Sequence, residues 1–313
     1  MVILKNLNSD KILSPTAVAL GFFDGVHLGH QRVIQNTIDC KDKGLSSCVF
    51  TFSVDHEAPA SKAGFKILST DTLKAQILEN MGVEFMFCPT FEEIKNLTPE
   101  QFVADILKNT LSAQCVACGD DFHFGIKASA GVKELKELCA QHNIMVNVIG
   151  PVQEDGLNIS SSRIRDYIKQ GNIKKANKLL GRPYTIDFEV IQGQRLGRTM
   201  SFPTINQKLP EVYVMPKFGV YASAALIHGK MYPSVTNIGI KPTVGGTQAL
   251  AETYILGYSG DLYGMRINVG LIEFIRPEVK FESIEILKQN IALDVEKAKK
   301  ISMEYISSIL MNK

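Results

Sequence analysis

The chain has 313 residues, which is longer than a typical single domain, so we expect two domains. Hydrophobic residues make up 45% of the chain, enough for each half to bury its own core. The net charge of +2 argues against a protein that mainly coats nucleic acid. The sequence shows no apolar stretch of membrane-spanning length. Its first residues, MVILKNLNSDK, lack a charged region leading into an apolar core, so we expect no signal peptide. These features favour a cytoplasmic enzyme without a nucleic-acid or membrane partner.

The first half alternates short apolar runs with amphipathic segments. We expect strands at residues 17–20, 47–52, 83–88, 115–118 and 145–149, and helices at 31–40, 72–81, 99–111 and 132–142. Two short helices should follow over 161–180, broken at 170–172. The alternation predicts an α/β domain with a doubly wound parallel sheet, and with ligands at the carboxyl ends of its strands.

Beyond residue 183 the pattern changes. Strands expected at residues 186–191, 219–227, 231–238, 252–258 and 266–274 follow one another without helices between them, which predicts an antiparallel β-barrel. A long helix should close the chain, with one apolar stripe formed by Ile284, Leu287, Ile291, Val295, Ala298 and Ile301. We therefore expect domains at residues 1–183 and 184–313.

Six cysteines are scattered through the sequence, and two of them form a CxxC pattern. Cys115 and Cys118 could be a redox or zinc pair. They lie in a strand-like run, where residues three apart point to opposite faces, and no second CxxC completes a zinc site. We expect reduced cysteines in the core.

The stretch GFFDGVHLGH, residues 21–30, places two histidines between an expected strand and an expected helix. A metal site lacks further ligands at a zinc-enzyme spacing, and a nucleophilic site lacks a serine or cysteine. A phosphate site fits better, because glycines allow close backbone approach and a helix N-terminus offers free amides. His27 and His30 can donate hydrogen bonds to phosphate oxygens. The remaining alternative is a glycine-rich turn whose histidines have no role.

Three ordered motifs resemble those of the prokaryotic bifunctional riboflavin kinase/FMN adenylyltransferases, also called FAD synthetases. HLGH at residues 27–30 is similar to the HxGH signature of nucleotidyltransferases. ISSSRIR at 159–165 is similar to ISSTxxR, and GDDFHFG at 119–125 is similar to a glycine followed by DFxFG. The resemblance spans nearly the whole chain.

The resemblance implies that the first half transfers AMP from ATP to FMN, giving FAD and pyrophosphate. His27 and His30 would contact phosphate oxygens, and Asp24 would lie near the ribose. The other residues implied for the nucleotide are Gly21, Phe22, Gly29, Ser160, Ser161 and Arg165, and those for the flavin are Asp121 and Phe124. The family's TFDPHP-like stretch reads TFSVDHEAP at residues 51–59, so His56 receives no role.

The second half is similar to riboflavin kinases. FPTIN at residues 202–206 resembles the PTAN motif, in which Thr204 and Asn206 would hold Mg²⁺ and Asn206 would also contact ATP. Glu252 would be the base that takes the proton from the terminal hydroxyl of riboflavin. NIGIKPT at 237–243 resembles NIGxxPT. The residues implied on the flavin side are Arg276, Glu278 and Phe281.

The kinase pattern departs from the family at three positions. Phe188 and Ser201 stand where glycines are usual, and Ile205 replaces the alanine of PTAN. A phenyl ring at position 188 could narrow the ATP site, since glycine lets a nucleotide approach the backbone. The alternative is therefore a monofunctional FMN adenylyltransferase whose barrel only binds flavin. An aminoacyl-tRNA synthetase-like enzyme would need a lysine-rich second loop, which the sequence lacks. The sequence does not indicate an oligomeric state.

Overall fold

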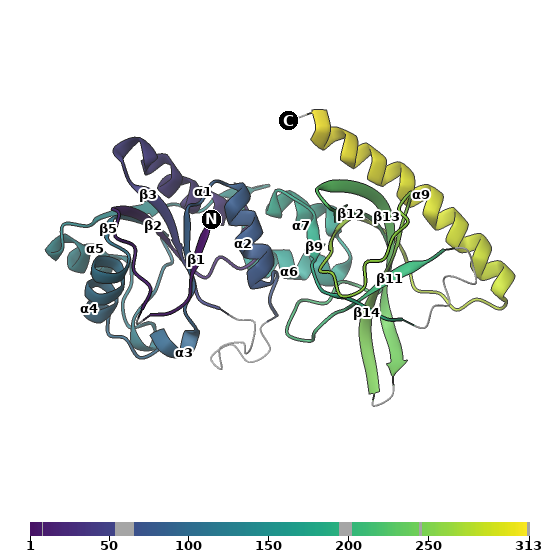
Figure 1. Cartoon of the computed structure of the whole chain (residues 1–313), viewed down its shortest axis with the longest axis horizontal. Helices are drawn as coiled ribbons and strands as arrows, with labels where there is room; N and C mark the ends of the chain where they lie inside the picture. Colours follow the sequence, from purple (N-terminus) through teal and green to yellow (C-terminus); the bar gives the residue numbers. More distant parts are fainter. Residues whose placement is uncertain (8, 54–65, 194–201, 244–245, 312–313) are drawn as a thin grey trace. The chain divides into compact units, whose positions relative to one another are not determined.

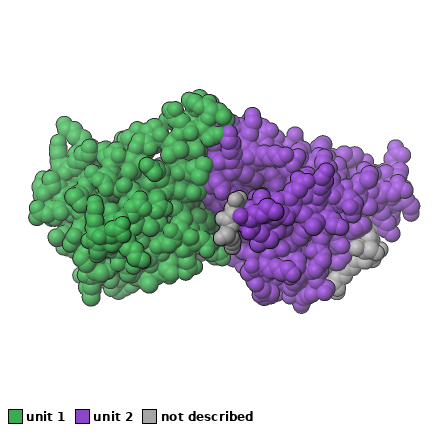
Figure 2. Space-filling view, turned by 90° about the horizontal axis from the view of Figure 1, so that it is seen from above, with its two compact units in different colours: residues 1–161 green, residues 162–313 purple. Residues whose placement is uncertain are grey.

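The structure is a computed structural model that describes residues 1–7, 9–53, 66–193, 202–243 and 246–311. The chain divides into two compact units, residues 1–161 and 162–313 (Figure 2). Most of the altered loop at 51–59 and Ser201 lie outside the described residues.

The first unit is built on six parallel strands. They are β1 (Val2–Leu4), β2 (Thr16–Leu20), β3 (Ser46–Phe50), β4 (Phe85–Phe87), β5 (Ala113–Gly119) and β6 (Met145–Ile149). Their order across the sheet is β1-β4-β3-β2-β5-β6, and each neighbouring pair is parallel. The predicted doubly wound parallel sheet is confirmed. Strand β1, which has only three residues, was not predicted.

Helices cover both faces of this sheet (Figure 1). On one face lie α1 (Leu28–Ile38) and α2 (Asp71–Asn80). On the other lie α5 (Val132–Gln141) and the π-helix η3 (Phe102–Thr110), which continues α4 (Pro99–Gln101). Shorter elements not predicted from the sequence are η1 (Asp39–Lys43), α3 (Phe91–Ile94), η4 (Ile126–Ala128), β7 (Gln153–Glu154) and β8 (Leu157–Asn158).

The position of β2 decides where a ligand can bind in the first unit. From β2 the chain adds β3 and β4 on one side of the sheet, and then β5 and β6 on the other. The direction of winding therefore changes beside β2. In sheets of this kind, ligands bind at the carboxyl ends of the strands at such a switch point. The loop that follows β2 there is the one with the two histidines.

The second unit is an antiparallel half-barrel. Its strands are β9 (Tyr184–Ile186), β10 (Val190–Ile191), β11 (Thr204–Lys208), β12 (Gly219–Ile227), β13 (Lys230–Thr243), β14 (Gly246–Ile255) and β15 (Asn268–Pro277). Their order is β10-β11-β14-β13-β12-β15-β9. The two edge strands, β9 and β10, are consecutive in sequence, so the sheet must curl, and a bridge between Glu189 and Arg266 joins its ends. The predicted antiparallel barrel is confirmed.

The final helix, α9 (Ile284–Met311), packs on this sheet as predicted (Figure 1). Val295 and Ala298 are buried against Val220 and Val235. Ile284 is 63% exposed, so the apolar stripe starts later than its first predicted member. No helix within the described ranges combines the length and apolar character needed to span a bilayer.

Two short helices, α6 (Ser161–Gln170) and α7 (Ile173–Leu180), occupy the predicted region. Asn177 of α7 donates a hydrogen bond from Nδ2 to the Leu271 carbonyl on β15 at 2.8 Å, and its Oδ1 accepts the Tyr184 N–H at 2.8 Å. Because α7 is bonded to β9 and β15, the compact division falls at the start of α6. A functional boundary at 183/184 stays a prediction.

The six cysteines are all free and buried. Burial raises the pKa of Cys115 to about 11 and that of Cys118 to about 11. A thiol with so high a pKa is a poor nucleophile at neutral pH. The structure therefore confirms core cysteines rather than a redox pair.

The interior of the half-barrel contains a chain of hydroxyl groups. The Ser223 hydroxyl bonds those of Ser234 and Thr236, each at 2.8 Å, and Thr236 bonds Thr253 at 2.9 Å. All four residues are fully buried. Burial removes these hydroxyl groups from water, so each needs a hydrogen-bond partner within the protein.

We predict that Thr236→Val lowers the free energy of unfolding by about 1–3 kcal/mol, because two buried hydroxyls lose a partner. Urea denaturation followed by circular dichroism measures this effect. Thr185→Val is the control, since its half-buried hydroxyl donates to the carbonyl of nearby Pro183, two residues away in sequence. Equal stability of the Thr236→Val variant and the wild type would contradict the importance of the hydroxyl chain.

Candidate active site

The loop after β2 follows an unusual backbone path. Phe23 has φ of 51° and Val26 has φ of 39°. Both lie in the left-handed region, which residues other than glycine rarely adopt. Phe23 is 2% exposed and Val26 is fully buried, so core packing holds both. A Cβ on Gly21 would lie 2.9 Å from the Phe23 ring. The first residue after β2 must therefore be small.

The two histidines stack on each other at the start of α1. His27 is the N-cap, and its Nδ1 accepts the backbone N–H of His30 at 3.2 Å. The ring centroids are 3.5 Å apart and the ring planes differ by 18°. A Cβ on Gly29 would lie 3.1 Å from the His27 ring, so glycine between the histidines permits this stack. The imidazoles thus lie at a helix N-terminus, where amides and dipole favour an anion.

Asp24 is a buried residue that holds the loop in place by hydrogen bonds. It is 2% exposed, and its Oδ1 accepts the Leu68 N–H at 2.9 Å. Beside it, the Gly25 N–H donates to Ser69 Oγ at 3.1 Å. These bonds attach the loop to the segment before α2. The contact of Asp24 with the ATP ribose stays a prediction.

The structure brings the ISSS segment against the same loop. Ser161 Oγ donates to the Asp24 carbonyl at 3.0 Å, and the Ile159 carbonyl would lie 3.9 Å from a Cβ on Gly29. Ser161 is also the first residue of α6, with Ser160 just before it. The residue that begins α6 is therefore hydrogen-bonded to the histidine loop. Arg165 is buried one turn further along α6, in the second compact unit.

The GDDFHFG segment leaves the neighbouring strand β5, whose Ala117 pairs with Ala19 of β2. A Cβ on Gly119 would lie 2.9 Å from Asp121 Oδ1, so this carboxylate folds back over the end of β5. Phe124 is 6% exposed and its ring lies 5.3 Å from that of Phe102. Phe124 is a core residue in this structure, and its contact with a flavin stays a prediction.

An aromatic cluster that was not predicted lies on the other side of β2. Phe22 stacks on Phe52 with ring centroids 4.8 Å apart, and Phe52 lies 5.3 Å from Phe91. Phe52 follows the end of β3, so it reaches the same edge of the sheet as the histidine loop. Its place just after a buried strand was the signal that could have identified it.

In the second unit, strand register collects the kinase-like residues. Asn206 on β11 lies opposite Glu252 on β14, which lies opposite Asn237 on β13. Residues directly opposite each other share a face, with Cβ atoms about 4.5–5.5 Å apart. Thr204 lies two residues before Asn206 and so faces the same side. The same row continues across β12 to Arg276 on β15.

The expected flavin-side residues lie in or beside this row. Arg276 donates from Nε and Nη2 to the Asp294 carboxylate of α9 at 3.0 and 2.7 Å. Its guanidinium lies 5.4 Å from the centre of the Phe281 ring. Asn237 Nδ2 donates to Glu278 Oε1 at 3.4 Å. Arg276 therefore ties α9 to β15, and the flavin contacts of these residues stay predictions.

The structure shows where two of the departures from the family pattern lie. Ile205 lies opposite Thr253, on the interior side, so it points away from Thr204 and Asn206. The half-buried Phe188 ring packs edge-on against Tyr213 at 5.1 Å. A further glycine, not predicted, matters here, since a Cβ on Gly193 would lie 2.4 Å from the Asn206 side chain. Within the described part of the chain, no group of three or more His, Cys, Asp or Glu residues could hold a metal.

Each half of the chain matches a known protein family. A model for FAD synthetase matches residues 9–163, and a model for riboflavin kinase matches residues 180–302. The bifunctional riboflavin kinase/FMN adenylyltransferase of Listeria monocytogenes is 36% identical, over 86% of each chain. That of Bacillus subtilis is 34% identical, over 94% of this chain and 93% of its own.

A solved structure agrees with the fold over almost the whole chain. It is described as a macrolide-efflux protein from Streptococcus pneumoniae and is 29% identical, with a TM-score of 0.81. The match covers 96% of this chain and 98% of that one. Both family models match, and the identity to these relatives is 34–36% over most of the chain, so the chain belongs to the family of bifunctional riboflavin kinase/FMN adenylyltransferases.

Proposed function

We propose that the chain makes FAD from riboflavin in two ATP-dependent steps. The second unit phosphorylates riboflavin to FMN, and the first transfers AMP from ATP to FMN with release of pyrophosphate. The observation that carries this proposal is the stacked pair of His27 and His30 at the start of α1, beside the switch point of a parallel sheet. The presence of both domains supports two activities over an adenylyltransferase with a flavin-binding barrel.

In adenylyl transfer, a phosphate oxygen of FMN attacks the α-phosphorus of ATP, and the bond to the pyrophosphate oxygen breaks. His27 and His30 donate hydrogen bonds to phosphate oxygens as negative charge develops, together with the amides of the loop and of α1. Gly21, Gly29, Ser160 and Ser161 line the path of the triphosphate, and Arg165 adds a positive charge. No covalent intermediate is needed, since positioning and charge stabilisation suffice.

In the kinase step, Glu252 accepts the proton of the terminal riboflavin hydroxyl, whose oxygen attacks the γ-phosphorus of ATP. Thr204, Asn206 and Glu252 present oxygen donors on one face of the sheet, the donor type that Mg²⁺ prefers. Thr204 and Asn206 would hold the ion, which neutralises charge on phosphate oxygens when it is bound. Arg276, Glu278 and Phe281 border the flavin. A cytoplasmic location without nucleic-acid or membrane partners stays a prediction.

The wild-type chain tests this proposal directly. Purified protein is incubated with riboflavin, ATP and Mg²⁺, and the flavins are separated by chromatography. We expect FMN and then FAD, and neither when EDTA replaces Mg²⁺. FAD from added FMN, without FMN from riboflavin, would support a monofunctional adenylyltransferase. The absence of both products would support a flavin-binding protein.

We predict that His30→Ala lowers FAD formation from FMN at least about 100-fold, because a donor to the developing charge is lost. Riboflavin phosphorylation by the same preparation should be unchanged. His142→Ala, a change at the C-terminus of α5, is the control. Full FAD formation by the His30→Ala variant would refute the assignment of the histidine loop.

We predict the opposite pattern for Glu252→Gln. FMN formation should fall at least about 100-fold, because the amide cannot accept the proton of riboflavin. FAD formation from supplied FMN should persist. Glu273→Gln on β15 is the matched control, since its carboxylate pairs with Lys174 at 2.7 Å. A Glu252→Gln variant that phosphorylates riboflavin at the wild-type rate would show that another group is the base.

A further inference from the structure

A fully buried lysine lies beneath the loop that carries the two histidines. Lys74 of α2 is 1% exposed. Its Nζ donates hydrogen bonds to the Phe22 carbonyl at 3.1 Å and to Thr51 Oγ1 at 3.3 Å. The same nitrogen lies 4.9 Å from the centre of the Phe22 ring and 3.7 Å from Asp71 Oδ1.

These contacts join three segments at the carboxyl edge of the parallel sheet. Phe22 belongs to the β2–α1 loop, Thr51 follows β3, and Lys74 comes from α2. The Thr51 hydroxyl also donates to the Phe22 carbonyl, at 2.9 Å. That carbonyl therefore accepts two hydrogen bonds, one residue before Phe23 takes its positive φ. The contacts hold the loop where its strained path begins.

Stability alone does not account for a lysine at this position. Removing an ammonium group from water costs several kcal/mol, and a buried ion pair is often no more stable than apolar residues of similar volume. The neighbouring Leu73 and Leu78 on α2 are buried apolar residues, so the surroundings suit a methionine of similar length. A cation there is better explained by its hydrogen bond to the Phe22 carbonyl, which holds the loop in place.

We propose that Lys74 is a positioning residue for adenylyl transfer. It fixes the Phe22 carbonyl, and through it the loop that presents His27 and His30 to the phosphates. The inference rests on the proposed adenylyltransferase function. Because Lys74 is 1% exposed, it acts through the loop rather than on the substrate. A displacement of about 1 Å in such a site costs about 100-fold in rate.

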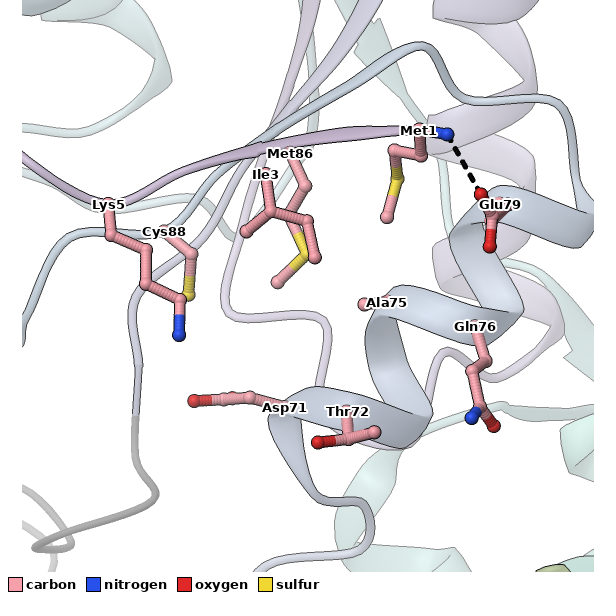
Figure 3. A pocket seen from close by; sticks show the side chains of 10 residues that line it. All are labelled: Met1, Ile3, Lys5, Asp71, Thr72, Ala75, Gln76, Glu79, Met86 and Cys88. Carbon is pink, nitrogen blue, oxygen red and sulfur yellow. Dashed lines mark hydrogen bonds and ion pairs between the residues drawn. The ribbon is translucent and has the colours of Figure 1, made fainter. Parts of the chain in front are cut away.

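The surroundings of Asp71 indicate that the protein tolerates loss of the lysine. Asp71 Oδ2 accepts a hydrogen bond from Ser53 Oγ. Asp71 also lines a cavity of about 270 Å³ together with Lys5, Thr72 and Cys88 (Figure 3). Water in this cavity can solvate the carboxylate once its partner is gone. We therefore expect the Lys74→Met variant to fold.

The test measures both reactions of the full-length Lys74→Met variant. We expect kcat/KM for FAD formation to fall at least about 30-fold, with a higher KM for ATP, because the phosphates meet a misplaced loop. Riboflavin phosphorylation by the same sample should be unchanged. Lys108→Met is the matched control, since Lys108 is exposed on η3, near the amino end of β5.

Two results would overturn the inference. One is FAD formation equal to that of the wild type. The other is a lower apparent kcat at unchanged KM for ATP with a lower unfolding temperature, which shows lost folded protein. If the wild type makes no FAD either, the proposed function itself has failed. If the wild type and the variant make FAD equally well, the role of Lys74 is refuted and the proposed function is not.

A second variant keeps the test decisive if Lys74→Met does not fold. Thr51→Val removes the hydroxyl that shares the Phe22 carbonyl and leaves the ammonium in place. We expect FAD formation to fall at least about threefold, with riboflavin phosphorylation unchanged. Where both variants fold, their effects should be non-additive in the double variant, because both act on one carbonyl. Thr51→Val with wild-type FAD kinetics, or strict additivity, would contradict the proposal.

Discussion

The strained backbone between β2 and α1 is the constraint on which the proposed adenylyltransferase site depends. Positive φ at Phe23 and Val26 costs about 1–3 kcal/mol each and persists only where the surroundings impose it. Those surroundings come from distant parts of the chain. The Leu68 N–H donates a hydrogen bond to the Asp24 carboxylate, and the Ser161 hydroxyl donates one to the Asp24 carbonyl. The Lys74 ammonium donates one to the Phe22 carbonyl. A loop held in this way presents its imidazoles and amides to an anion without reorganising them.

The second unit positions its polar residues by strand register instead of loop strain. Along β11, successive side chains alternate between the two faces of the sheet. Thr204 and Asn206 therefore share a face with Glu252, and Ile205 faces the interior with Thr253. This alternation explains why an isoleucine can replace the family's alanine without displacing the oxygen donors. A change of the same size at Thr204 or Asn206 would fall on the face of the proposed kinase site.

The sequence predicts most of the fold because buried parallel strands read as short apolar runs between amphipathic helices. It missed β11, since Asn206 and Gln207 are polar although they are buried. Gln207 donates from Nε2 to the Phe188 and Ile267 carbonyls, so hydrogen bonds rather than apolar character allow its burial. The motifs located the histidine loop and the row at Glu252. They could not show that Asp24 and Phe124 are turned into the protein, because burial depends on tertiary packing.

Lys74 shows what a motif match leaves out. A lysine in a helix is exposed by default, and the stretch around it, DTLKAQIL, matches none of the recognised motifs. Its spacing carried a signal, since Leu78 lies four residues later and residues four apart share a helix face. A charged residue on the buried face of a helix needs polar partners. Here the partners are a carbonyl and a hydroxyl at the carboxyl ends of β2 and β3. In a parallel sheet that edge is where ligands bind. A cation buried there can therefore hold the ligand-binding loop in position without contacting the ligand.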